Sequence, residues 1–466
     1  MWYSLAGKLI KGLFMKRAFL LIWLLLVPSI ALADWNPAFT VHKFGTGSPV
    51  VLIVGGIQGD EPGGFSAAAL LSTQYRFTRG SIWVVPNLNF PSIIRRSRGL
   101  HGDMNRKFAR LAENDPEYAT VRRIQNLITD PEVDLVLNLH DGSGFYRPNY
   151  EDKNNNPYRW GQSVIVDMSV LDGHPFGDLE RHARKVVAEV NKVLLQPKHI
   201  YHVMNTHTDK GHPEMEKTLS WFAVRNGKPA YGLEASKEFT VPGRTYYHLN
   251  VIEAFLKLAG LEFERSFPLT FKGVQAALQN DLSVTFAGDR FHLPLEDVRP
   301  RLRGYIPLPR DLYADLSVSK PILAVLKDEN ELLVHYGNRL LTRFTPEWHD
   351  CRHEAPDFSV MVDGQPRTVR VGEIVPVREW FLVKPTGLRI NAIGTGRGPD
   401  ESNTRLGKKN FRPEYSLDTG QTIFRVEGYY GKEFAGMFLV RFADRQVTVQ
   451  RNYLPDIAGP ESDLGR

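Results

Sequence analysis

Short apolar runs separated by amphipathic stretches dominate residues 40–260 and constrain the fold more than any other feature of the sequence. Each run has the length of a buried strand, and there are five of them: 50–55, 82–86, 135–139, 164–166 and 230–233. The stretches between them have helical length and periodicity. Alternation of this kind predicts an α/β domain with a mostly parallel central sheet covered by helices.

Three of the intervening stretches carry the start or stop signals of helices. The first is expected to begin at Asp115 with Pro116 as its first helical residue, because proline loses no hydrogen bond at that position. The second starts at Asp178. The third begins near Tyr246 and ends before Gly260, since glycine commonly follows the last turn of a helix.

After Gly260 the pattern changes to short alternating segments separated by turn residues. The dipeptides at 337–338 and 363–364 each separate two apolar runs, so both pairs are predicted to be hairpins. A further strand pair is expected over 423–430 and 437–442. We therefore expect one or two small all-β domains, of sandwich or immunoglobulin-like type, after the α/β domain.

These patterns predict an order of segments along the chain. Residues 34–260 form the α/β domain, which is followed by a small β-rich domain over 261–350. Residues 351–455 form an immunoglobulin-like β domain. Residues 1–33 are set apart as a signal peptide and residues 456–466 as a tail.

Residues 1–33 have the pattern of a secretory signal peptide. Basic residues precede a short apolar run, and the Ala-x-Ala pattern of Ala31 and Ala33 allows cleavage before Asp34. Met15, directly before this pattern, is a candidate start of translation. The apolar run is too short to cross a membrane comfortably, and an uncleaved anchor is the alternative. We expect export to the periplasm without stable membrane insertion after cleavage.

Charge and cysteine content narrow the class of protein. The net charge is +6 and falls to +2 without residues 1–33, which hold four basic and no acidic side chains. No basic stripe indicates a nucleic-acid groove. The single cysteine, Cys351, excludes an internal disulfide framework and a cysteine-rich zinc site. An exported protein with one unpaired cysteine fits a bacterial periplasm better than a disulfide-stabilised extracellular module.

Polar residues follow three of the apolar runs, at the ends of predicted strands. Gln58 and Glu61 lie three apart in a glycine-rich loop, His140 ends a second run and Glu234 ends a third. Open α/β sheets build their sites at the carboxyl ends of strands. Two oxygen donors and an imidazole fit a catalytic zinc site with one open position. Alone, each residue has an ordinary structural interpretation, and only their joint placement indicates a site.

The order of these elements resembles the zinc carboxypeptidase (funnelin) family over residues 45–260. The shared elements are a strand, a two-ligand loop, the Asn105-Arg106 pair, a strand ending in histidine and a strand ending in glutamate. This chain has Gln58 where the family usually has histidine. In that respect it resembles a subfamily of periplasmic DL-carboxypeptidases, which trim peptidoglycan peptides and determine cell shape. Those proteins also carry β domains after the catalytic domain.

The resemblance implies one Zn²⁺ held by Gln58, Glu61 and His140. Glu234 would act as general base and then as acid toward the leaving amine. A neutral amide oxygen is a poorer zinc ligand than imidazole, because zinc favours nitrogen, sulfur and charged oxygen donors. We therefore expect a functional site with reduced metal affinity.

The resemblance also implies residues that bind the substrate. Asn105 and Arg106 match the pair that grips the terminal carboxylate, which a guanidinium can bind in bidentate fashion. Arg98 matches the arginine that stabilises the tetrahedral oxyanion. Its neighbours Arg95 and Arg96 leave that assignment open.

The implied function is hydrolysis of the C-terminal peptide bond of peptidoglycan stem peptides, from tripeptide to dipeptide with release of diaminopimelate. One alternative is an amidohydrolase of the succinylglutamate desuccinylase and aspartoacylase type, which shares the metal loop. Another is a non-catalytic cell-wall-binding pseudo-carboxypeptidase whose site has decayed at Gln58. Retention of Glu234 argues against decay. The β domains could dock other cell-wall proteins, and no nucleic-acid partner is expected.

Two further groups of residues have open interpretations. His202, His207 and His212 invite a second metal site, but their spacing matches no helical face, and a polar loop with exposed histidines explains them better. Trp160 and the turn at 142–147 follow His140 closely enough to line its pocket.

Overall fold

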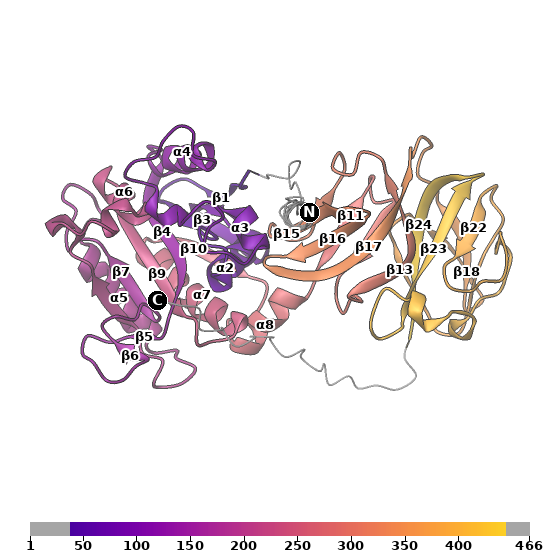
Figure 1. The fold of residues 1–466 in the computed structure, drawn as a ribbon. Helices are drawn as coiled ribbons and strands as arrows, with labels where there is room; N and C mark the ends of the chain where they lie inside the picture. Colours follow the sequence, from indigo (N-terminus) through magenta and orange to yellow (C-terminus); the bar gives the residue numbers. More distant parts are fainter. Residues whose placement is uncertain (1–37, 444–466) are drawn as a thin grey trace, which may run out of the picture. The chain divides into compact units, whose positions relative to one another are not determined.

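The structure is a computed structural model that describes residues 38–443 (Figure 1). The predicted signal peptide and tail lie outside the described residues, as does the end of the last β domain. Within the part of the chain that the structure describes, no helix is long and apolar enough to cross a membrane.

An eight-stranded sheet forms the centre of the α/β domain. Its strands lie in the order β1 (His42–Thr46), β3 (Tyr75–Val85), β2 (Val50–Val54), β4 (Val133–Gly142), β9 (Ala230–Ser236), β7 (Ser163–Val166) and β8 (His202–Asn205), with β10 (Glu262–Arg265) also paired to β3. Strand β2 runs parallel to β3 and β4, β4 runs parallel to β9, and β7 runs parallel to β8. The predicted mostly parallel sheet is confirmed, with antiparallel pairs at β1, at β10 and between β7 and β9.

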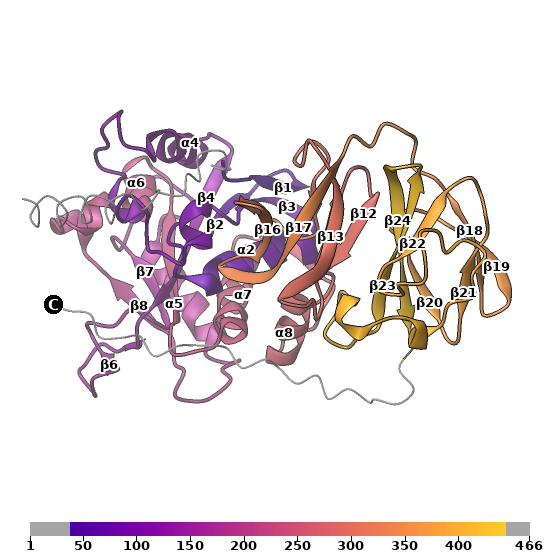
Figure 2. The same cartoon turned by 45° about the vertical axis from the view of Figure 1, so that its right-hand side comes forward.

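Helices cover both faces of this sheet (Figures 1 and 2). On one face α2 (Pro62–Gln74), α5 (Leu179–Val190) and α7 (Val241–Leu258) pack together. The helices α4 (Tyr118–Ile128) and α6 (Leu219–Arg225) lie on the other side of β4. The short helices α3 (Phe90–Ile94), η1 (Met104–Arg106), η2 (Thr208–Lys210) and η3 (Met215–Lys217) lie in the connections.

The predicted helix starts were correct in one case and wrong in two. Asp178 caps α5 as expected, with its side chain accepting a hydrogen bond from the Arg181 N–H. Helix α4 begins at Tyr118 rather than at Pro116, because Asp115 Oδ1 accepts the Glu117 N–H at 2.8 Å and forms a turn before the helix. Helix α7 begins earlier than expected, at Val241.

The change of pattern at Gly260 concealed one more helix of the α/β domain. Helix α8 (Phe271–Gln279) packs against α7 and α2, and its apolar face joins the core of the α/β domain through Val274, Ala277 and Leu278. The α/β core therefore extends beyond the expected boundary at residue 260. A helix of nine residues between two β segments has too few turns to dominate the local pattern.

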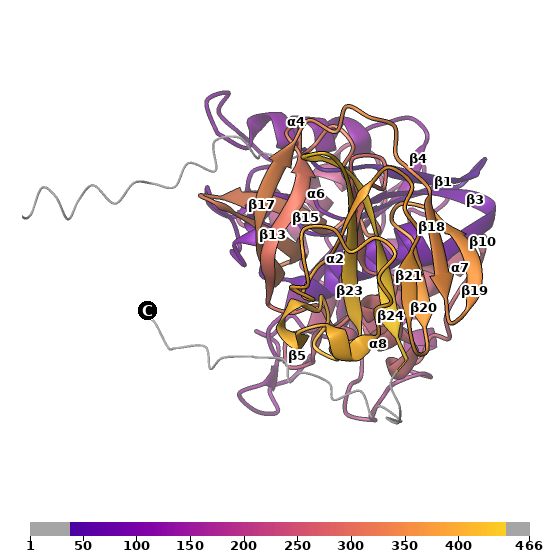
Figure 3. The same cartoon turned by 90° about the vertical axis from the view of Figure 1, so that its right-hand side faces the viewer.

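The rest of the chain is built of strands in two regions. The first pairs β11 (Ser283–Phe286), β12 (Phe291–Pro294) and β14 (Ser317–Val318), and separately β13 (Arg301–Pro309), β17 (Arg339–His349), β16 (Glu331–Tyr336) and β15 (Leu323–Asp328). The second pairs β19 (Gln365–Val369), β18 (Phe358–Val362) and β21 (Phe381–Val383), and separately β20 (Ile374–Val377), β24 (Glu433–Phe442), β23 (Ile423–Tyr430) and β22 (Arg389–Ala392). Figure 3 shows β23 and β24 side by side. All three predicted strand pairs are confirmed.

The two β regions share part of their hydrophobic core. Met437 and Leu439 on β24 belong to the same buried cluster as Ile306 and Phe344 of the first region. The inner residues of the two sheets of the second region, among them Val360 and Phe438, form a separate cluster. The sequence predicted a division near residue 350. The two β regions on either side of it are joined by a common buried cluster.

Candidate metal centre and substrate pocket

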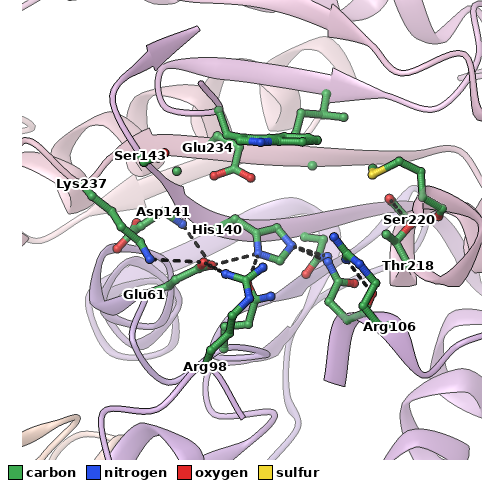
Figure 4. Close-up of a pocket in the computed structure, with 18 residues that line it drawn as sticks. Glu61, Arg98, Arg106, His140, Asp141, Ser143, Thr218, Ser220, Glu234 and Lys237 are labelled. Carbon is green, nitrogen blue, oxygen red and sulfur yellow. Dashed lines mark hydrogen bonds and ion pairs between the residues drawn. The ribbon is translucent and has the colours of Figure 1, made fainter. Parts of the chain in front are cut away.

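All of the site residues predicted from the sequence line one pocket (Figure 4). They are Gln58, Glu61, Arg98, Asn105, Arg106, His140 and Glu234. The sheet explains why residues far apart in sequence meet. Strands β4 and β9 are parallel neighbours, and His140 pairs directly with Glu234 in their register. The loop after β2 opens at the same carboxyl edge, because β2 is parallel to β4.

Three donor atoms converge beside the sheet edge. The Nδ1 atom of His140 lies 3.0 Å from Gln58 Oε1 and 2.9 Å from Glu61 Oε2. All three side chains are buried. Burial alone would lower the pKa of His140, but the Glu61 carboxylate more than offsets this and raises it. A buried cluster of one imidazole, one carboxylate and one amide oxygen is chemically suited to a divalent metal.

The amide of Gln58 supplies the third donor of this set. Among residues 38–443, no three His, Cys, Asp or Glu side chains come together in a group that could hold a metal ion. The Nε2 group of Gln58 donates to Asp103 Oδ1 at 2.8 Å, which leaves Oε1 directed at His140. Asp103 also accepts from Arg98 Nε at 3.0 Å. Burial would raise the pKa of Asp103, but Arg98 and Gln58 outweigh it and lower the pKa.

The loop that carries Gln58 and Glu61 packs closely on the backbone of residues 92–97. A Cβ atom at Gly59 would lie 2.0 Å from Ser92 O, so only glycine fits there. The Gly59 N–H donates to Ser97 O at 2.9 Å. Glu61 is the residue before the first turn of α2, and Pro62 begins the helix, where the missing N–H costs nothing. The helix therefore starts directly after the loop of Gln58 and Glu61.

The far side of the His140 ring contacts two amides. Its Nε2 lies 2.8 Å from Asn138 Nδ2 and 3.4 Å from Asn105 Nδ2. Both atoms near Nδ1 are acceptors, so Nδ1 carries the proton in this structure and Nε2 accepts from the Asn138 amide. A metal at Nδ1 would require the proton on Nε2, and rotation of the Asn138 amide would then supply an acceptor, because its Oδ1 is buried without a hydrogen-bond partner in the described chain. Histidines that bind metals usually donate their second ring N–H to such a partner.

Glu234 faces the donor cluster across the pocket (Figure 4). Its Oε2 atom is buried without a hydrogen-bond partner among residues 38–443. Burial, with the nearby carboxylates Glu61 and Asp141 and against the effect of His140, raises the pKa of Glu234 to about 8. An unpaired buried carboxyl beside a metal-type cluster is the arrangement expected of a group that exchanges protons.

Arginine side chains form the opposite wall. Arg98 donates from Nε to Asp103 and lies 3.3 Å from Glu61 Oε1, and 49% of its side chain is exposed. The Arg106 side chain is less exposed; its Nη1 donates to Asn105 O and its Nε lies 3.5 Å from Glu214 Oε2. The positive charges can meet a carboxylate that enters from solvent.

The Asn105 side chain, predicted to bind the substrate, also makes two contacts within the protein. Its Oδ1 accepts the Leu219 N–H at 2.9 Å, and its Nδ2 is the group near His140. The side chain thus connects η1 to the start of α6 on the floor of the pocket. Its Nδ2 group remains on the pocket wall.

Sequence reasoning missed several charged residues of the site, among them Lys237 and Asp103. Lys237 lines the pocket and lies 2.9 Å from Asp60 Oδ2 and 3.8 Å from Glu61 Oε1. Asp103 orients Gln58 and Arg98 as described above. Their positions, three residues after Glu234 and two before Asn105, were the available signals. Trp160 lines the pocket, as does the start of the turn after His140.

The three clustered histidines do not form a second site. His207 and His212 are exposed and His202 is half-buried on β8. None of the three lines the pocket. The interpretation as a polar loop with largely exposed histidines agrees with the structure.

Comparison with known proteins identifies the family. Residues 15–279 match the family described as the catalytic domain of carboxypeptidases controlling helical cell shape. The chain belongs to this family. Residues 280–350 match its β-barrel domain, and residues 351–443 match a C-terminal domain of metallocarboxypeptidases. A metallocarboxypeptidase fold with two added β regions is therefore present, as the resemblance in the sequence implied.

The solved structures similar to this chain include the cell shape determinant protein Csd4 from Helicobacter pylori. The tripeptide-bound form is 37% identical, with a TM-score of 0.80, and the match covers 87% of this chain and 100% of that one. A form bound to mDAP, described as a D,L-carboxypeptidase, is 38% identical with a TM-score of 0.79, covering 85% and 97%. A curated relative is an N-α-acetyl-L-2,4-diaminobutyric acid deacetylase from Halomonas elongata, 35% identical over 111 residues. That match spans 22% of this chain and 31% of the deacetylase.

Proposed function

We propose that this protein is a zinc-dependent D,L-carboxypeptidase that removes the terminal diaminopimelate from peptidoglycan tripeptides in the periplasm. The observation that carries the proposal is the convergence of Gln58, Glu61 and His140 beside an unpartnered buried carboxyl, Glu234. The similarity to Csd4, which has been crystallised with a tripeptide and with mDAP, supports the substrate class.

In this proposal Gln58 Oε1, Glu61 Oε2 and His140 Nδ1 hold the zinc ion. Bound zinc supplies Lewis-acid polarisation of the scissile carbonyl and of the attacking water. Asp103 and Asn138 act behind the donors, since they orient the Gln58 amide and the His140 ring. Both neighbours lie close enough to select which atom faces the metal position.

Glu234 is the group that moves the proton. Its free Oε2 accepts a proton from the attacking water and then delivers it to the nitrogen of the leaving amine. No other side chain among residues 38–443 competes for that oxygen by hydrogen bonding. Glu234 itself is buried, which limits its contact with solvent during the transfer.

The arginines restrict the reaction to the end of a peptide. Arg106 and Asn105 would bind the terminal carboxylate, because the guanidinium fork matches a carboxylate and the Nδ2 group of Asn105 donates beside it. Arg98 would stabilise the oxyanion that forms at the scissile carbonyl, since its guanidinium lies next to Glu61 in the donor cluster. These three roles make the enzyme an exopeptidase.

The segment 1–33 supports the proposed location. A cleaved signal peptide would deliver the chain to the compartment that contains peptidoglycan. The β regions would then lie in the periplasm with the catalytic domain, where contact with other cell-wall proteins is possible.

The decisive experiment is incubation of zinc-loaded protein from residue 34 onward with purified tripeptide and tetrapeptide muropeptides. Conversion of tripeptide to dipeptide by wild type, and not by Glu234→Ala, is the expected result. If zinc binds but neither peptide is converted, N-acylated amino acids become the next substrates to assay. That outcome would favour the amidohydrolase alternative, for which the partial similarity to a deacetylase is the available support.

Sedimentation of the same two proteins with purified peptidoglycan tests the wall-binding alternative. If the protein is a binding module, wild type and Glu234→Ala would sediment with peptidoglycan equally well, and neither would release an amino acid from it. A complete lack of zinc binding by wild type would also favour this alternative, because the catalytic proposal requires the metal.

A further inference from the structure

The turn between β16 and β17 is buried, although hairpin turns normally face solvent. Gly337 in this turn has φ +55° and is buried. A Cβ atom at Gly337 would lie 2.6 Å from Cε2 of Phe65, so the aromatic ring packs directly on the glycine. The end of β16 accordingly lies beside α2 in both views (Figures 1 and 2). The turn of the β region therefore docks on the α/β domain.

Phe65 is the contact on the catalytic side. It lies in the first turn of α2, four residues after Glu61. Its side chain is only 2% exposed, yet it is not part of the hydrophobic core of the α/β domain. The hairpin turn contributes to the burial of Phe65. The contact between them lies at the start of α2, directly after the loop of Gln58 and Glu61.

A second contact joins the turn to the segment that carries Arg98. The Nε group of Arg96 donates to the backbone carbonyl of Asn338 at 2.5 Å. Arg96 itself has a left-handed backbone conformation, with φ +51°, which a non-glycine residue adopts only when its surroundings stabilise it. The next residue, Ser97, accepts the Gly59 N–H from the metal loop. Arg98 follows directly.

We propose that the turn at 337–338 positions Arg98 for the reaction by holding Arg96. Helix α3 ends at Ile94, so the segment that carries Arg98 has no regular structure of its own. The half-exposed Arg98 side chain contacts Asp103 and Glu61 at the pocket wall, so the position of its backbone decides whether the guanidinium reaches them. The first β region thereby contributes to catalysis without touching the substrate. This inference rests on the proposed role of Arg98 in the carboxypeptidase reaction.

The direct test is tripeptide hydrolysis by Arg96→Ala, with Arg95→Ala as the matched control. Both variants remove one arginine charge from the same segment, but only the first removes the bond to Asn338. We expect kcat of Arg96→Ala to fall about tenfold, because small displacements of groups far from the chemistry reduce rates strongly. KM, zinc affinity and Tm should stay near the wild-type values, and Arg95→Ala should keep the wild-type kcat. Arg96→Lys, which can still donate to the carbonyl, should recover most of the lost rate.

A double-mutant cycle shows whether Arg96 acts through Arg98. In an Arg98→Ala background, Arg96→Ala should cause no further loss of kcat, since the group that it positions is already absent. Full additivity of the two losses would overturn the inference. Equal activity of Arg96→Ala and Arg95→Ala would also overturn it, as would a loss for Arg96→Ala that appears only as a lower Tm or weaker zinc binding. An inactive wild type would instead refute the proposed function.

Discussion

Glu234 and Glu427 are both buried glutamates on strands, but their surroundings are opposite. Glu427 is 2% exposed, and both of its oxygens are satisfied, Oε1 by Arg425 Nη1 at 2.8 Å and Oε2 by the Tyr429 hydroxyl at 2.6 Å. Glu234 is 8% exposed, and its Oε2 has no hydrogen-bond partner in the described residues. Burial raises the pKa of each carboxyl. The two carboxyls therefore differ in their hydrogen-bond partners and not in how far they are buried.

The difference separates groups that stabilise the protein from groups kept for chemistry. An unpaired buried polar group costs about 1–3 kcal/mol of folding free energy. Glu234 has this folding cost at the carboxyl end of β9, inside the pocket. An unpaired buried group in such a place indicates a function. The cluster around Glu427 has the opposite character, because Arg425 also donates to the backbone of Tyr305 and ties β23 to the first β region.

The largest effect is expected for Glu234→Gln. Loss of the proton-transfer group should reduce kcat on the tripeptide by about 10²- to 10⁴-fold. Stability should not fall, because the amide removes a buried carboxyl that had no partner. Steady-state hydrolysis at saturating zinc and thermal unfolding measure the two effects. A variant with more than a tenth of the wild-type kcat would contradict the assignment.

Glu427→Ala should have the reverse profile. It leaves the Arg425 guanidinium buried without its carboxylate, and breaking one side of a buried pair costs about 3–5 kcal/mol. Urea unfolding would record the loss, while kcat per folded molecule should match wild type. Replacing both partners, as Arg425→Met with Glu427→Leu, should restore much of the stability. If fully folded Glu427→Ala lost activity, the assignment of Glu427 to stability and of Glu234 to catalysis would be wrong.

A smaller effect is expected when Gln58 is changed to histidine. Imidazole is a better zinc donor than a neutral amide, so Gln58→His should bind zinc about tenfold more tightly. Competition with a chromophoric chelator measures the affinity. If the variant binds zinc no more tightly than wild type, the Gln58 amide is not a ligand. Gln125, a buried glutamine on α4 away from the pocket, supplies the control substitution Gln125→His.

The smallest effect concerns a half-buried group outside the pocket. Burial, assisted by Arg96 and Arg95, lowers the pKa of His335 from 6.5 to about 4. Because the folded state then binds fewer protons than the unfolded state, stability is present above pH 6.5 and is lost as the pH falls toward 4. Thermal unfolding between pH 7 and 4 should show a smaller decline for His335→Gln than for wild type. Identical pH profiles would show that His335 is accessible to protons when folded.

Much of the site could be predicted because its residues follow strands. Apolar runs that end on His140 and Glu234 predict both the strands and the polar edge at which they meet. Asp103 and Lys237 could not be predicted in the same way. Their importance depends on contacts with Gln58 and Asp60 that no local pattern records. Helix α8 was missed for a related reason, since its burial against α7 defines it more than its composition does.

The sequence by itself determined the α/β class, the hairpins and the candidate donor residues, because these depend on local periodicity and on side-chain chemistry. The tertiary structure alone decided which atom of Gln58 faces His140, that Glu234 is left unpaired, and that Gly337 is buried on Phe65. Those features depend on distances between segments that are far apart in the chain. Such distances are set by the packing of the whole fold and not by neighbouring residues.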